Sequence, residues 1–144
     1  MSATTMDLLG VNLAGAEFGS AGQAYGQGYT YPTHAEIDYE AANGMNVIRL
    51  PFLWERLQPT LNGSLDAAEL ARIDDVVVYA ASKGLTVDLD LHDYGNYDGQ
   101  AVGSAAVPNS AFADLWGKLA GHFAGSPNVI FGLMNEPQQS SAAG

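Results

Sequence analysis

The strongest constraint on the fold of this chain is a pattern that repeats about every 40 residues. Three helix-like stretches close at Gly44, Gly84 and Gly125, which lie 40 and 41 residues apart. Short runs rich in Val, Ile and Leu follow these glycines at 46–50, 86–91 and 128–134, and a similar run at 8–13 precedes the first stretch. A glycine closes each helix because the chain must turn there through a left-handed conformation. The pattern therefore predicts alternating strands and helices.

Two of the predicted helices carry capping signals at their start. Thr33 is followed three residues later by Glu36, the spacing of a capping box, so the first helix is expected to begin at Thr33. The second is expected to begin at Ser64 or Asp66, with Glu69 placed to reach back to Asp66.

The third predicted helix begins at Asn109 or Ser110, directly after Pro108, and runs to Gly125. Its apolar residues recur at helical spacing and form one stripe: Phe112, Leu115, Trp116, Leu119 and Phe123. A stripe of this kind packs against a sheet.

Strands that alternate with helices at this interval form parallel sheets with right-handed crossovers. Two α/β architectures fit the order: a small doubly wound sheet, or half of a (β/α)8 TIM barrel. In 87–92 apolar residues alternate strictly with Asp88, Asp90 and His92, and Arg49 interrupts another apolar run. Doubly wound strands are apolar on both faces, whereas a barrel places polar groups near its mouth. The pattern favours four strands and three helices of a half-barrel, one domain over 1–144.

Composition excludes several classes of function. Sixteen acidic and five basic residues give a formal net charge of −11, which repels nucleic acids and anionic membranes. The absence of cysteine excludes disulfides and thiolate metal sites. The longest apolar runs, such as 76–81, are too short to span a bilayer, and no Lys or Arg precedes Arg49, so no signal peptide is visible.

Polar residues occur where the predicted strands end, which is where parallel β/α folds place their sites. Glu17 follows the first strand, Arg49 ends the second, His92 ends the third, and Asn135 and Glu136 follow the fourth. The steps from 49 to 92 and from 92 to 136 are 43 and 44 residues, one repeat each, so Arg49, His92 and Glu136 should converge.

Each of these residues also has a plain structural interpretation. Arg49 could be a structural cation paired with Asp90, His92 could be a rim histidine, and Glu136 could be an ordinary loop carboxylate. Their shared position at one end of the sheet favours a common site.

The loops at the same end are rich in aromatic residues, namely Phe18, Tyr25, Tyr29, Tyr31, Trp54, Tyr94 and Tyr97. Aromatic faces stack on the C–H faces of pyranose rings, while Asn, His and carboxylates bind the hydroxyls. Loop packing is the alternative explanation for some of these residues. We expect Trp54 and Tyr94 to contact a neutral polysaccharide.

Four segments, 10–18, 47–59, 89–94 and 135–137, resemble glycoside hydrolase family 5, and in particular its cellulases, the endo-β-1,4-glucanases. They include Val47-Ile48-Arg49-Leu50-Pro51 and Asn135-Glu136-Pro137. The resemblance implies a (β/α)8 barrel that hydrolyses β-glucans with retention of configuration, needs no metal or cofactor, and is secreted.

The resemblance also implies roles for individual residues. Glu136 would be the general acid/base, and Asn135 would bind the 2-hydroxyl of the sugar at the cleavage point. His92 would bind a hydroxyl of the same sugar, and Arg49 would keep the nucleophilic carboxylate ionised. These roles agree with a retaining mechanism that uses two carboxyl groups about 5–5.5 Å apart.

The sequence lacks several residues of the family pattern, among them the nucleophile, the His and Tyr of the sixth strand and the Trp of the eighth. The family's nucleophile is a glutamate on the seventh strand, and no acidic residue follows Glu136 here. The chain is therefore expected to correspond to the N-terminal half of the barrel and to pair either with a second copy, as a homodimer, or with a C-terminal half. The rival hypothesis is a non-catalytic fragment that binds glucan or self-assembles.

Overall fold

The protein is described by a computed structural model over residues 9–93 and 95–132. Four parallel strands form one sheet in the order β1-β2-β3-β6. They are β1 (Gly10–Asn12), β2 (Val47–Phe52), β3 (Thr86–Leu91) and β6 (Val129–Gly132). These are the four strands that the repeat predicts, and each pairs with the next one along the chain. The predicted alternation of parallel strands with helices is therefore confirmed.

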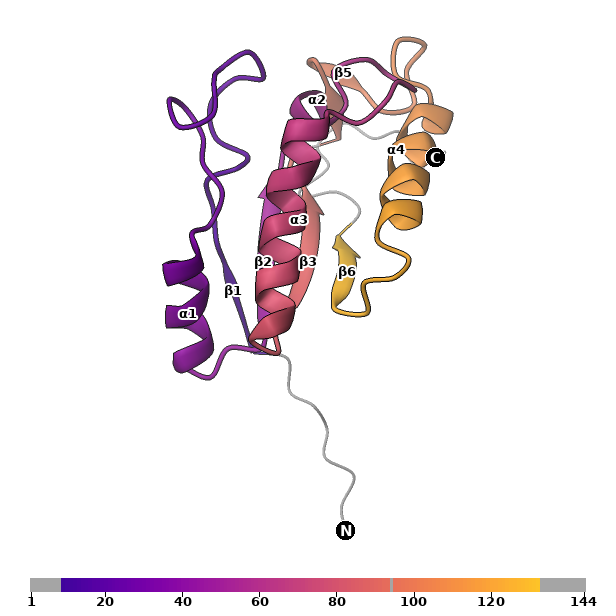
Figure 1. The fold of residues 1–144 in the computed structure, drawn as a ribbon. Helices are drawn as coiled ribbons and strands as arrows, with labels where there is room; N and C mark the ends of the chain where they lie inside the picture. The colour runs from indigo at the N-terminus through magenta and orange to yellow at the C-terminus, as the bar shows by residue number, and fades with distance from the viewer. Residues whose placement is uncertain (1–8, 94, 133–144) are drawn as a thin grey trace.

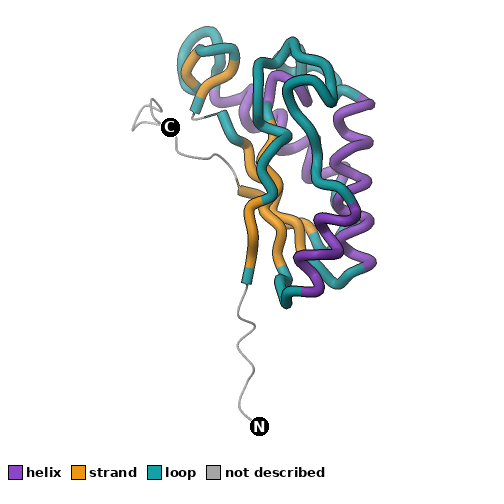
Figure 2. Tube along the Cα trace, turned by 90° about the vertical axis from the view of Figure 1, so that its left-hand side faces the viewer, coloured by secondary structure: helices purple, strands orange, loops and turns teal. Residues whose placement is uncertain are grey.

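Three main helices cover one face of this sheet, as Figure 2 shows. They are α1 (His34–Ala42), α3 (Ala67–Ser82) and α4 (Asn109–His122), and they follow the sheet from β1 to β6 in Figure 1. The strand residues that face them are buried: Ile48, Leu50, Phe52, Val87, Leu89 and Leu91. The core lies between the sheet and this single helical layer.

The predicted helix starts agree with the structure, with one correction. Thr33 caps α1 in a complete capping box with Glu36, as predicted. Asp66 caps α3 by accepting the backbone N–H of Glu69 at 2.9 Å. The Glu69 side chain does not reach back to Asp66, because it bonds Tyr29 and two other side chains instead.

The closing glycines behave differently at the three repeats. Gly44 and Gly84 have φ angles of 84° and 75°, the left-handed conformation that the pattern requires. Gly125 is not among the residues with positive φ, since α4 already ends at His122. The prediction that Gly125 closes the third helix is therefore wrong, although the apolar stripe of α4 does pack on the sheet.

The other face of the sheet carries the alternating polar residues. Asp88 and Asp90 point away from the helices, as the parity of β3 predicts, and Asp88 lies beside Ile130 in the register. Ile130 is 43% exposed although it is apolar. Among the described residues no helix covers this face, in agreement with the inner wall of a half-barrel.

Two small elements were not predicted. A four-residue helix, α2 (Trp54–Leu57), follows β2, and a hairpin of β4 (Asn96–Tyr97) and β5 (Gln100–Ala101) follows β3. Both lie at the carboxyl end of the sheet, where Figure 1 places them together. None of the described helices is long and apolar enough to cross a membrane.

We predict that the 144-residue chain is not a stable monomer. In the described sheet, β1 and β6 each have a neighbour on one side only, and unpaired strand edges favour association. Association that covers the exposed inner face would gain roughly 25 cal/mol of stabilising free energy per Å² of apolar area buried. Analytical ultracentrifugation at micromolar concentration measures the association. A sharp monomer with a cooperative melt would contradict this prediction.

Candidate active site

Three of the predicted polar residues meet on the inner face, at the carboxyl end of the sheet. The Nη2 atom of Arg49 lies 2.9 Å from Oδ2 of Asp90, and Nδ1 of His92 lies 3.1 Å from the same oxygen. Asp90 is buried, while the Arg49 side chain is 34% exposed. One buried carboxylate therefore holds a guanidinium and an imidazole together near the carboxyl end of the sheet.

A glycine on the neighbouring strand β6 leaves room for the carboxylates of Asp88 and Asp90. Gly132 on β6 is the register partner of Asp90, and a Cβ atom there would lie 3.2 Å from Oδ1 of Asp88 and 3.4 Å from Oδ1 of Asp90. Burial, followed by the nearby charge of Asp90, raises the pKa of Asp88, and Arg49 opposes this shift. The inner face thus concentrates two acidic residues around one arginine.

A cleft of about 450 Å³ opens next to this cluster and brings together residues from three strand ends. Glu17 and Phe18 come from the loop after β1, Leu53 and Glu55 follow β2, and His92 follows β3. Glu17 and His92, both candidate site residues from the sequence, line this cleft together. Oε2 of Glu17 accepts the N–H of Gly15 at 2.8 Å, which holds the carboxylate in place at the rim.

The structure corrects the expectation for Trp54. Its side chain is fully buried, with an exposed fraction of 0%, and its indole Nε1 donates to Oε1 of Gln58 at 2.8 Å. Tyr97 packs edge-on against it, with ring centroids 4.9 Å apart. Trp54 therefore supports the cleft from beneath, and the prediction that it stacks on substrate is wrong. Three loop tyrosines, Tyr29, Tyr31 and Tyr97, are likewise buried, whereas Phe18 and Tyr25 are exposed.

The sequence placed Asp93 at the end of the third strand but did not predict that its carboxyl group pairs with that of Glu55 in the wall of the cleft. Asp93 is buried, accepts the backbone N–H of Trp54 at 2.7 Å, and shares a side-chain hydrogen bond with Glu55. Glu55 in turn accepts the N–H of Asp98 at 2.7 Å. Burial, followed by the charge of Glu55, raises the pKa of Asp93 to about 9. A protonated Asp93 that donates to Glu55 accounts for this arrangement.

Replacing Asp93 with Asn should stabilise the protein relative to the wild type, and this advantage should increase as the pH rises. The pKa of Asp is about 3.9 in an unfolded chain and about 9 in the folded one. Between these values the unfolded chain releases a proton that the folded one retains, so wild-type stability falls as the pH increases. Asn keeps both hydrogen bonds without titrating.

Urea denaturation of both proteins at pH 4, 6 and 8 measures this effect. The advantage of Asp93→Asn should grow with pH and reach at least about 1.4 kcal/mol at pH 8, the equivalent of one pKa unit. A difference that is the same at all three pH values would show that Asp93 does not hold its proton.

A second feature that the sequence did not reveal is the anchor of the loop that carries Glu17. The buried guanidinium of Arg56 donates to the carbonyl oxygens of Ala16, Phe18 and Ser20, the last two at 2.9 and 3.0 Å. Its Cζ atom lies 3.5 Å from the centroid of the Tyr29 ring. An isolated charge in a four-residue helix has no periodic signal, so only the three-dimensional contacts identify this role.

Three predicted site residues, Tyr94, Asn135 and Glu136, lie outside the described residues. Within 9–93 and 95–132 no group of three or more His, Asp and Glu side chains is placed to hold a metal ion.

The fold and the position of the site define the class of protein: an α/β chain that forms half of a TIM barrel, with its polar residues at the carboxyl ends of the strands. The family model described as Cellulase (glycosyl hydrolase family 5) matches residues 6–143. The chain therefore belongs to glycoside hydrolase family 5, as the sequence motifs indicated.

Solved structures and curated proteins agree with this assignment. The endo-β-1,4-glucanase Xac0029 from Xanthomonas axonopodis pv. citri is 46% identical, with a TM-score of 0.89 over 92% of this chain and 42% of that one. Endoglucanase Cel5A from Pseudomonas stutzeri is 38% identical, with a TM-score of 0.89 over 94% and 43%. Endoglucanase 1 from Saitozyma flava is 38% identical over 89% of this chain and 38% of its own length. This chain spans less than half the length of these relatives.

Proposed function

We propose that this chain supplies the acid/base half of a retaining β-1,4-glucanase, with Glu136 as the general acid and base. The observation that carries the proposal is the arrangement of Arg49 and His92 on one oxygen of Asp90, beside a cleft that also contains Glu17. Glu136 follows the last residue of β6, Gly132, by four residues in the sequence. A solved relative, XacCel5A, 49% identical, is in complex with cellopentaose.

The chemistry requires two carboxyl groups. In the first step Glu136 gives its proton to the glycosidic oxygen as the C–O bond breaks, and a second carboxylate attacks the anomeric carbon. In the second step Glu136 takes a proton from water, which displaces the sugar from that carboxylate. We infer that a C-terminal half-barrel provides the second carboxylate and that Arg49 keeps it ionised.

The substrate follows from charge and from the site. The net charge of −11 disfavours anionic polymers, and the rim of the cleft combines the exposed Phe18 with the polar groups of Glu17 and His92. A neutral β-glucan fits both features. In this proposal His92 and Asn135 bind sugar hydroxyls, Tyr94 contributes a stacking face, and the enzyme acts outside the cell, where polymeric glucan is found.

A non-catalytic role is the second candidate, because apolar Ile130 on the inner face of the described sheet is 43% exposed and could lie in an interface. A fragment of this kind would bind glucan or associate with itself without cleaving it.

Hydrolysis of carboxymethylcellulose tests the proposal. We expect the 144-residue chain alone to be at least about 10⁴-fold less active than a complete relative, because this proposal assigns the carboxylate that forms the glycosyl-enzyme to the C-terminal half. Adding the C-terminal half of a family 5 endoglucanase should restore activity, and Glu136→Gln should abolish it again. Full turnover by the chain alone, or restored activity that survives Glu136→Gln, would contradict this assignment.

A further inference from the structure

We propose that Asp90 is a positioning residue, which keeps the proton of neutral His92 on Nδ1 so that Nε2 serves as a hydrogen-bond acceptor in the cleft. His92 lines the cleft of about 450 Å³, and its Nδ1 atom lies 3.1 Å from Oδ2 of Asp90. The inference rests on the proposed function for the identity of the ligand, a hydroxyl group of a β-glucan that donates its hydrogen to Nε2.

The position of Arg49 decides the direction of the hydrogen bond between Asp90 and His92. Its Nη2 atom lies 2.9 Å from the same oxygen, Oδ2 of Asp90. Because a guanidinium only donates hydrogen bonds, this oxygen acts as an acceptor toward both of its neighbours. The proton between Asp90 and His92 therefore belongs to Nδ1. In a neutral imidazole the other nitrogen then carries no proton and can only accept.

Burial strengthens this control over the ring. The Asp90 side chain is 4% exposed, whereas that of His92 is 17% exposed. Water competes poorly for a buried carboxylate oxygen, so the bond to Nδ1 is stronger than it would be at the surface. Since Nδ1 is turned to Asp90, Nε2 is the nitrogen that the ring can present to the cleft.

The other two histidines of the chain contact their aspartates through the opposite nitrogen. Nε2 of His34 on α1 lies 2.9 Å from Oδ2 of Asp75, and Nε2 of His122 on α4 lies 2.7 Å from Oδ1 of Asp74. Both pairs join neighbouring helices of the outer layer. All three histidines thus meet a carboxylate, but His92 alone does so through Nδ1 and from the cleft.

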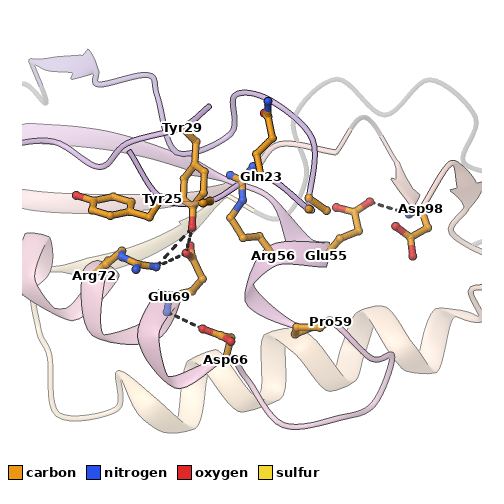
Figure 3. Close-up of a pocket in the computed structure, with 13 residues that line it drawn as sticks. Gln23, Tyr25, Tyr29, Glu55, Arg56, Pro59, Asp66, Glu69, Arg72 and Asp98 are labelled. Carbon is orange, nitrogen blue, oxygen red and sulfur yellow. Dashed lines mark hydrogen bonds and ion pairs between the residues drawn. The ribbon is translucent and has the colours of Figure 1, made fainter. Parts of the chain in front are cut away.

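A second buried carboxylate shows that burial beside an arginine does not by itself produce this arrangement. Glu69 lines a separate cavity of about 490 Å³, where Figure 3 shows its contacts with Tyr29 and Arg72. It joins a loop to α3, and no histidine is among its partners in the described part of the chain. Asp90 instead joins an arginine to the histidine of the cleft.

Nitrogen NMR of the 144-residue chain at about pH 8.5, where ordinary imidazoles are neutral, tests the inference. Protonated and unprotonated ring nitrogens have well separated chemical shifts, so the spectrum gives the tautomer of each ring. His92 should carry its proton on Nδ1, while His34 and His122 should carry theirs on Nε2 and serve as internal controls. A proton on Nε2 of His92, or on both of its nitrogens, would overturn the assignment.

Three variants separate positioning from a structural role. Asp90→Ala removes the acceptor, so the His92 ring should shift toward the Nε2–H form, whereas Asp90→Asn keeps an amide oxygen there and should preserve the Nδ1–H form. Asp88→Ala, which removes the carboxylate two residues earlier on the same strand, is the matched control and should leave the tautomer unchanged. If Asp90→Ala lowers stability without changing the tautomer, Asp90 is not a positioning residue. Should Asp90→Ala fail to fold, the wild type and Asp90→Asn still decide the question.

Hydrolysis of cellotetraose by the chain together with a C-terminal half-barrel connects the tautomer to function. Asp90→Ala should lower kcat/KM about tenfold, because the hydrogen bond from the sugar hydroxyl to Nε2 is lost, and Asp90→Asn should retain more activity. If the tautomers are as expected but the completed barrel does not hydrolyse cellotetraose, the proposed function fails and the role of Asp90 toward His92 stands. If the barrel is active while His92 carries its proton on Nε2, the role of Asp90 is wrong and the proposed function stands.

Discussion

Glu136→Gln should separate two kinds of substrate in the completed barrel. Glycosidic bonds in cello-oligosaccharides have poor leaving groups that need a proton, so their hydrolysis should fall by about 10²- to 10⁴-fold. Aryl glycosides with activated leaving groups depart without protonation, so the step that breaks their glycosidic bond should fall by less than about tenfold.

The measurement is the rate of glycosyl-enzyme formation on cellotetraose and on a dinitrophenyl cellobioside, with the chain and a C-terminal half-barrel present together. Glu40→Gln on α1 is the matched control, because it makes the same chemical change on a helix away from the cleft. Equal losses on both substrates would mean that Glu136 does not act as an acid, and that its role is binding.

The repeat in the sequence predicted much of the fold because its signals are local. The capping box at Thr33, the left-handed glycines at 44 and 84, and the alternation in β3 each depend on residues close together in the chain. Parallel topology then brings equivalent strand ends together, so the sequence alone predicts that Arg49 and His92 lie at the same end of the sheet.

The parts that sequence reasoning missed depend on contacts between distant segments. Trp54 was expected to face the substrate because it follows a strand, yet Tyr97, more than 40 residues later, packs over it. A loop aromatic can face solvent or the core, and no local pattern distinguishes these outcomes. The pairing of Asp93 with Glu55 also depends on a contact between distant segments, since neither residue alone indicates a shared proton.

Glu69 is the clearest example, because its position in the helix conceals its tertiary role. It is the third residue after the N-cap of α3, as Glu36 is in α1, and this spacing predicts that both side chains reach back to their N-cap. Among the residues that the structure describes, the Glu36 side chain bonds only to its own cap, Thr33. Glu69 is buried and binds Tyr29 and Tyr31, about 40 residues earlier in the chain.

Glu69→Ala should therefore destabilise the protein far more than Glu36→Ala. Removing the buried carboxylate leaves the hydroxyls of Tyr29 and Tyr31 without their acceptor and Arg72 without its ion pair, at a cost of about 3 kcal/mol. Glu36→Ala makes the same change at an exposed capping position and should cost about 0.5–1 kcal/mol. Chemical denaturation of the two variants gives both values.

A larger effect at Glu69 would also have a consequence for the site. Tyr29 and Tyr31 belong to the loop that carries Glu17, and Arg56 holds the same loop against α2. Amide hydrogen exchange of residues 15–31 should then accelerate in Glu69→Ala and remain unchanged in Glu36→Ala, because only the first releases the loop. Equal losses of stability in the two variants, with equal exchange in this loop, would show that Glu69 acts only as a helix cap and that Arg56 alone holds the rim of the cleft.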